Sequence, residues 1–114
     1  MKALSIAQPH AEAIMRGVKS IQHRAHPTSV RGRIYIYATM RRYARKEAAF
    51  MLEMCGLTDV VSAELPRGIL VGTVELWDCT GSGGHYQWHF RNPERATEPL
   101  KPTKRPHPLW FDPF

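Results

Sequence analysis

Long apolar runs, cysteines and acidic residues are all scarce in this sequence. Its apolar stretches, such as residues 69–71, last only a few residues, far short of the roughly 20 that a membrane-spanning helix needs. Polar residues 8–10 interrupt the start of the chain before the apolar part of a secretory leader could form. Cys55 and Cys79 each stand in apolar surroundings, which favours two small buried thiols over a disulfide framework. We therefore expect a cytoplasmic protein that does not engage a membrane.

Several common functional motifs are also missing. The sequence has no Gly-x-Ser-x-Gly elbow, no phosphate-binding loop and no dinucleotide fingerprint, and the glycine-rich residues 81–84 lack the strand-to-helix context of such loops. Six histidines could suggest a metal, but His85 and His89 lie on an expected strand, where their spacing separates them by about 13 Å. We expect neither a metal site nor a cofactor.

Positive charge is plentiful and unevenly placed. The chain of 114 residues has 16 Lys and Arg against 10 Asp and Glu, and residues 1–50 hold ten of the basic residues and only two of the acids. The 43% hydrophobic content is typical of a globular protein, and the length suits one domain over residues 1–114. A basic half of this kind favours an anionic partner, although solubility alone can also explain it.

The periodicity of apolar residues predicts an α+β fold. Alternating patterns predict strands at 3–6, 19–24, 33–38, 69–77, 85–90 and 109–111, and helical spacing predicts helices at 9–16 and 43–55. The prolines after residue 92 forbid a long helix there. Together the pattern predicts a small curled β-barrel of five to six strands with two main helices.

The densest group of polar residues surrounds the first expected helix. Lys19 follows a glycine that can end this helix, and Gln22 and Arg24 share one face of the next expected strand because their spacing is two. The alternative interpretation is that Lys19 and Arg24 are ordinary solvated surface charges.

These residues belong to a pattern that resembles the ASCH domain, the activating signal cointegrator homology family, which is similar to the PUA domain. The resemblance covers nearly the whole chain and is most specific in its first 38 residues. It rests on Ala3, Leu4, Ser5, Ile6, Gln8, Pro9, Ala11, Ile14, Gly17, Lys19, Ile21, Arg24, Arg31, Gly32, Ile34, Ile36 and Ala38, and continues in residues 68–76 and 86–90. It implies a PUA-like barrel that binds RNA in a cleft beside the first helix. Some small ASCH members are nucleases, or amidohydrolases that act on N4-acylcytidine.

The resemblance carries over to the catalytic positions only in part. Lys19 matches the lysine of the Gly-x-Lys-x-x-Thr motif of the amidohydrolase-like members, but Gln22 stands where their threonine would be. Many other members have an acidic residue at that position, and Gln22 departs from them too. Glu75 is the nearest available acid for the catalytic glutamate, and its alternative role is an ion pair with a basic group. A hydrolase would use Lys19 with Glu75.

From these residues we expect RNA or a nucleoside-type ligand to bind in a polar cleft. Its predicted lining is Gln8, Lys19, Gln22, Arg24 and Glu75. The predicted path for phosphates and stacked bases is Arg31, Arg33, Tyr35, Tyr37, Arg41, Arg42, Arg45 and Lys46. The tyrosines could instead pack beneath the second helix. A further alternative is a protein-interaction adaptor that uses the proline-rich tail and Trp110.

Overall fold

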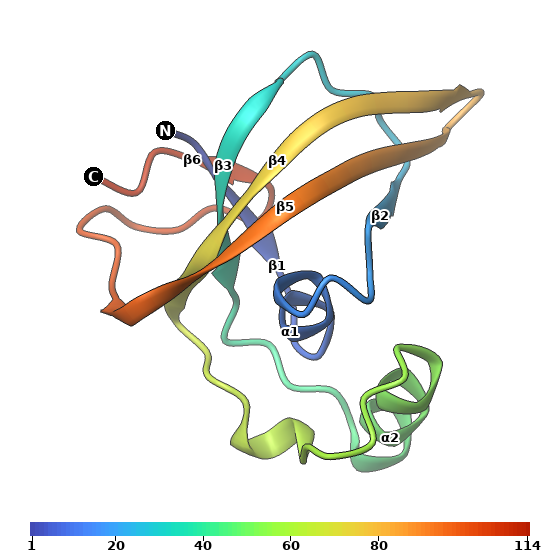
Figure 1. Ribbon diagram of the computed structural model, residues 1–114, viewed down its shortest axis with the longest axis vertical. Coiled ribbons are helices and arrows are strands. Elements are labelled where there is room, and N and C mark those ends of the chain that lie inside the picture. Colours follow the sequence, from blue (N-terminus) through green and yellow to red (C-terminus); the bar gives the residue numbers. More distant parts are fainter.

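Six strands form one curled sheet in the computed structural model, which describes residues 1–114 (Figure 1). The strands are β1 (Ala3–Ile6), β2 (Ile21–Arg24), β3 (Gly32–Ala38), β4 (Ile69–Ser82), β5 (His85–Leu100) and β6 (Trp110–Phe111), in the sheet order β2-β5-β4-β3-β1-β6. The helices are α1 (His10–Met15), α2 (Arg45–Met54) and the short 3-10 helix η1 (Ser62–Glu64). The sheet curls into a half-barrel, which confirms the predicted α+β class.

Strand alternation creates the main core on the concave face of the sheet. Ile34 and Ile36 on β3 and Val74 and Leu76 on β4 are fully buried, as a period of two requires. β1 runs parallel to β3, whereas every other pair of neighbouring strands is antiparallel. Trp88 on β5 completes this core, and its indole N–H donates to the carbonyl of His26 at 3.0 Å.

Helix α1 lies inside the curl of the sheet. The backbone N–H of Glu12 donates to Gln8 Oε1 at 2.9 Å, which satisfies one of the free amides at the start of the helix. Ala11 and Ile14 belong to the main core. Gly17, with φ of 76°, ends the helix in the left-handed conformation that favours glycine. The chain therefore turns directly from α1 towards Lys19 and β2.

The C-terminal residues cover the other face of the sheet. Tyr37 is 7% exposed and packs edge-on against Phe111, with ring centroids 5.4 Å apart, in a second cluster that includes Ala3 and Leu70. Tyr35 packs edge-on against Phe114. The alternative that these tyrosines pack beneath the second helix is wrong, because Phe111 and Phe114 pack against them instead.

Strand β5 is longer than the expected 85–90, because it continues to Leu100 through Pro93 and Pro99. β2 pairs only with residues 86–89, so the later part of β5 is an edge strand. Proline is tolerated at an edge, because its missing N–H is not needed there for a hydrogen bond to a neighbouring strand. Asn92, with φ of 52°, lies where the register with β4 shifts. The prolines thus mark an edge strand with a bulge instead of separate short pieces.

Helix α2 lies outside the half-barrel, below α1 in Figure 1. Ala48 is its one buried residue, and Phe50 and Met54 are more than 60% exposed. A connection that contains η1 leads from α2 back to β4. Neither α1 nor α2 has the length and apolar composition of a membrane-spanning helix.

Candidate functional site

A half-buried cluster of cationic groups surrounds Lys19. The short turn after α1 places Lys19 two residues before β2, and its Nζ lies 3.2 Å from His10 Nδ1 at the start of α1. Since an ammonium only donates, His10 Nδ1 accepts and the proton of the neutral ring sits on Nε2. Cys55, at the end of α2, brings its Sγ to 3.9 Å from the same nitrogen. The Lys19 side chain thus lies between helices and not in bulk water.

Arg24 and Gln22 share one face of β2, as their spacing predicts, and this face is turned inwards. Both are half-buried, whereas His23 between them is exposed. Arg24 donates from Nη2 to the carbonyl of Ser5 at 3.3 Å, and its guanidinium lies 5.7 Å from the ring centre of Trp88. Its buried Nε has no hydrogen-bond partner in the protein, and neither has the buried Oε1 of Gln22. One donor and one acceptor are therefore left over on the same face of β2.

Burial lowers the pKa values of His10, Lys19 and Arg24 alike. Burial lowers the pKa of His10, and the Lys19 charge lowers it further. Burial also lowers the pKa of Lys19; Cys55 opposes this shift, and Arg24 adds to it. Burial lowers the pKa of Arg24 as well. Neither Lys19 nor Arg24 forms an ion pair with a carboxylate, so the cluster carries uncompensated positive charge.

A cavity of ≈ 240 Å³ adjoins the cluster on the side of β5. Gly17, Lys19 and Ser20 bound it after α1, and Arg91 and Asn92 bound it from β5. Its floor is formed by core side chains of α1 and the sheet. The cavity is smaller than typical ligand pockets, and Lys19 is the one charged residue of its lining without an ion-pair partner, because Arg91 pairs with Glu75.

Gln8 does not join this cluster. It is fully buried, donates from Nε2 to the carbonyl of Pro66 at 2.9 Å and accepts the Glu12 amide. Both of its polar groups are therefore occupied in holding α1 against the connection that precedes β4. We correct the expectation for Gln8 accordingly: it is a structural contact beside the site.

Glu75 lies away from Lys19 as well. On β4 it points to the face opposite Val74 and Leu76, where its carboxylate accepts from Arg91 at 2.9 Å and from Asn92 at 3.2 Å. The hydrogen bond from Arg91 lowers the pKa of Glu75. The ion-pair alternative therefore describes Glu75, and we do not place it in the pocket.

The expected nucleic-acid path divides into separate places. Arg31 donates to the carbonyls of Thr28 and Val30 in its own loop. Arg33 donates to Thr73 Oγ1 at 3.0 Å, on the face of β3 opposite Ile34. Tyr37 is buried and Tyr35 is half-buried against Phe114, which removes Tyr37 as an open stacking platform.

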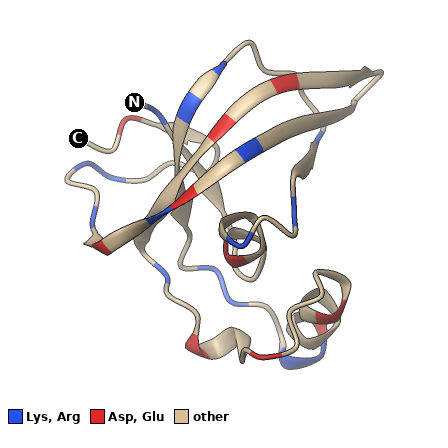
Figure 2. Cartoon of the chain, viewed as in Figure 1, with Lys and Arg blue, Asp and Glu red and all other residues tan.

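The remaining basic residues gather where the chain enters α2 (Figure 2). Arg41, Arg42, Arg45 and Lys46 are all exposed, and the Arg41 guanidinium lies 4.5 Å from the ring centre of Tyr43. None of the four forms an ion pair. These residues form a separate basic surface around the start of α2.

Sequence reasoning missed His10 and Cys55 as neighbours of Lys19. His10 was recognisable as a polar residue next to Gln8-Pro9, but Cys55 reaches it from 45 positions away. It also missed the buried carboxylate of Glu12, which accepts hydrogen bonds from both Arg16 and Arg95. No group of three His, Cys, Asp or Glu side chains is arranged to hold a metal ion.

Comparisons with known proteins identify a homologue. No protein-family model matches the chain. The chain is 34% identical over 80 residues to Activating signal cointegrator 1 of Homo sapiens and 35% identical over 80 residues to Activating signal cointegrator 1 of Mus musculus. Each match covers 67% of this chain but only 14% of the relative. The chain is therefore homologous to a short stretch of Activating signal cointegrator 1.

Proposed function

We propose that the chain is an ASCH domain of PUA-like fold that binds single-stranded RNA or a nucleoside through the cluster of His10, Lys19, Gln22 and Arg24. Three findings support the ASCH assignment: the homology to Activating signal cointegrator 1, the curled six-stranded sheet, and a helix directly after the first strand. The proposal covers residues 1–114 as one domain.

The observation that carries the proposal is the uncompensated polar chemistry around Lys19. Half-buried cations without a carboxylate are costly in a protein, because burial disfavours the charged form. A ligand that brings a phosphate or a base carbonyl supplies the missing negative charge. A base edge also offers a donor to Gln22 Oε1 and an acceptor to Arg24 Nε, two of the three buried side-chain atoms that the protein leaves without partners.

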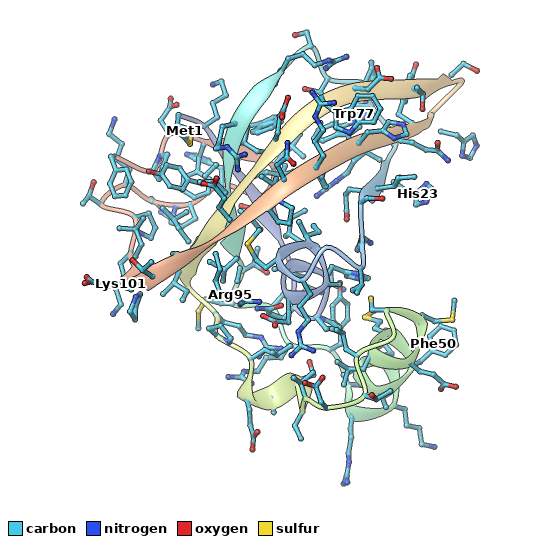
Figure 3. The ribbon with its side chains drawn as sticks, in the orientation of Figure 1. Met1, His23, Phe50, Trp77, Arg95 and Lys101 are labelled. Atoms are coloured by element: carbon cyan, nitrogen blue, oxygen red, sulfur yellow. The ribbon has the colours of Figure 1, made fainter.

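A fluorescence-polarisation titration of a labelled single-stranded RNA tests the proposal. Lys19→Ala should weaken binding at least about tenfold, because it removes a charge-assisted hydrogen bond. Lys101→Ala is the matched control, since Lys101 is exposed and lies at the far end of β5, well away from α1 (Figure 3). The proposal fails if both variants weaken binding equally and lower the salt dependence by the same amount, because only unspecific attraction would then remain.

One observation favours a second candidate function, hydrolysis of an N4-acylated cytidine. A lysine that acts as a base or nucleophile needs a lowered pKa, and burial together with Arg24 provides this at Lys19. The expected acid, Glu75, is bound to Arg91 instead, and Gln22 is not a nucleophile. Release of cytidine from N4-acetylcytidine that Lys19→Ala abolishes would establish the enzyme, and no release at high protein concentration would leave the binding function alone.

A further inference from the structure

The largest cavity of the molecule, of ≈ 550 Å³, lies between α2 and the connection that contains η1. Seven of its eleven lining residues are apolar, and the only charged ones are Arg42, Arg45 and Arg67. Ala49 and Leu52 line it from α2, and residues 60–63 line it from the opposite side. It is distinct from the Lys19 cluster, because none of its lining residues is shared with the cavity beside Lys19.

The walls of this groove are held in place by Arg67. Its guanidinium donates to the carbonyls of Ser62 at 2.8 Å, Leu65 at 3.1 Å and Arg41 at 3.2 Å. These hydrogen bonds join the segment before α2 to the connection after it. The groove is therefore formed before a ligand arrives, which lowers the ordering cost of binding.

The two arginines at the mouth are free to bind. Arg45 forms no hydrogen bond or ion pair, and Arg42 makes only a long hydrogen bond of 3.4 Å to the carbonyl of Ala63. Both are exposed; Arg42 lies three residues before α2, and Arg45 is its first residue, where the helix dipole adds positive potential. An apolar groove with an arginine mouth and no acid in its lining is complementary to an apolar group flanked by carboxylates.

The openness of the groove decides what kind of ligand fits. Ala49, Val61 and Ala63 are exposed like the two arginines, so a small molecule would not be enclosed to the degree that small-ligand sites require. A phosphate backbone would match the arginines but not the apolar lining. We propose that the groove between α2 and residues 60–63 docks an acidic, amphipathic peptide segment of a partner protein, with an apolar side chain against Leu52 and Val61 and carboxylates on Arg42 and Arg45.

The test is a fluorescence-anisotropy titration of the full chain with a labelled peptide in which a Phe-Leu pair is flanked by glutamates. A second peptide carries lysines in place of the glutamates. The acidic peptide should bind in the range between micromolar and millimolar, and the basic one should not. The double variant Arg42→Glu/Arg45→Glu should weaken binding about tenfold or more. Each substitution replaces the attraction between an exposed arginine and a peptide glutamate by repulsion. Ala49→Asp should weaken binding by a similar factor.

Lys46→Glu is the matched control. It makes the same charge change as Arg45→Glu at the next position, but Lys46 does not line the groove. Phe50, which points away from the rest of the molecule in Figure 3, serves as an apolar control in Phe50→Ala. Equal weakening by Arg45→Glu and Lys46→Glu would overturn the proposal, since unspecific attraction would then explain the binding.

Two further outcomes would also overturn it. In the first, single-stranded RNA shifts the backbone NMR signals of Ala49 and Val61, whereas the acidic peptide shifts neither. The groove is then part of a nucleic-acid path. If those signals shift on dilution of the chain alone, a second copy occupies the groove. The RNA titration of Lys19→Ala is read separately, so a failure of the peptide leaves the proposed function of the Lys19 cluster untouched.

Discussion

Replacing Glu12 by Gln should remove the ion pairs of the most buried paired carboxylate in the fold. Glu12 on α1 is 6% exposed, and Arg95 binds its two oxygens at 2.9 and 3.0 Å, reaching from β5 towards α1 (Figure 3). Arg16 Nε donates to Oε2 at 2.8 Å from the next turn of the chain. Arg16 in turn binds Asp59 at 2.7 Å. One carboxylate therefore ties α1 to the sheet and, through Arg16, to the connection after α2.

The size of the effect follows from the burial of each partner. Breaking a fully buried ion pair costs about 3–5 kcal/mol. The carboxylate of Glu12 is buried, but the side chains of Arg16 and Arg95 are 31% and 47% exposed, so water can solvate them after the change. We therefore expect a loss of about 2–3 kcal/mol in the free energy of unfolding. For a chain of 114 residues this lowers Tm by about 8–12 °C.

The effect should also depend on pH in a defined direction. Burial raises the pKa of Glu12, but the hydrogen bonds from Arg95 and Arg16 outweigh it and hold the pKa below its ordinary value of 4.5. A group whose pKa is lower in the folded state stabilises the fold above its unfolded pKa and loses this contribution as the pH falls through the folded value. The difference between wild type and Glu12→Gln should thus be constant near pH 7 and should shrink below about pH 4.5.

Urea denaturation followed by tryptophan fluorescence, at constant ionic strength and at several pH values, measures this difference. Glu47→Gln is the control, because Glu47 is exposed on α2 and has no ion-pair partner. A loss below about 1 kcal/mol, or a difference that stays constant into the acid range, would refute the reasoning from burial and charge.

Two further predictions concern the sheet and the cluster. Gly72→Ala should lower the free energy of unfolding by about 1–3 kcal/mol in thermal or urea denaturation, because a new Cβ on β4 would press on the backbone of residues 94–95 and on Met15 Sδ; an unchanged stability would contradict this close packing. The pKa of His10, followed by NMR of its ring protons, should lie below 6.5. Lys19→Gln should raise this pKa, because it removes the neighbouring positive charge. An unchanged pKa in this variant would contradict the contact between Lys19 and His10.

Local sequence patterns predicted most elements of the fold because their causes are local. The alternation of Ile34 and Ile36 with polar neighbours marks β3, and Gly17 marks the end of α1. The extension of β5 to Leu100 was not predictable in this way. Its prolines are tolerated because β2 stops pairing at His89, which is a property of another strand.

The site was predictable where spacing alone decides the direction of a side chain. Gln22 and Arg24 share the inner face of β2 because alternate residues on a strand point the same way. Glu75 shows the limit of this reasoning. The sequence names it as the nearest available acid, but whether it lies near Lys19 depends on how the sheet curls around α1. In the structure Arg91 on the neighbouring strand binds its carboxylate.

The sequence also does not show which basic residues stabilise the fold and which are available to a ligand, because this depends on the partner of each charge. Arg95 on β5 and Arg24 on β2 both reach another element, yet Arg95 is neutralised by Glu12, whereas Arg24 reaches only a backbone carbonyl and an aromatic ring. The two residues are indistinguishable as charges in the sequence. Burial penalises an unpaired cation far more than a solvated one. The ion pair of Arg95 therefore stabilises the fold, whereas the lack of a carboxylate at Arg24 and Lys19 is the reason why we propose these two residues for binding.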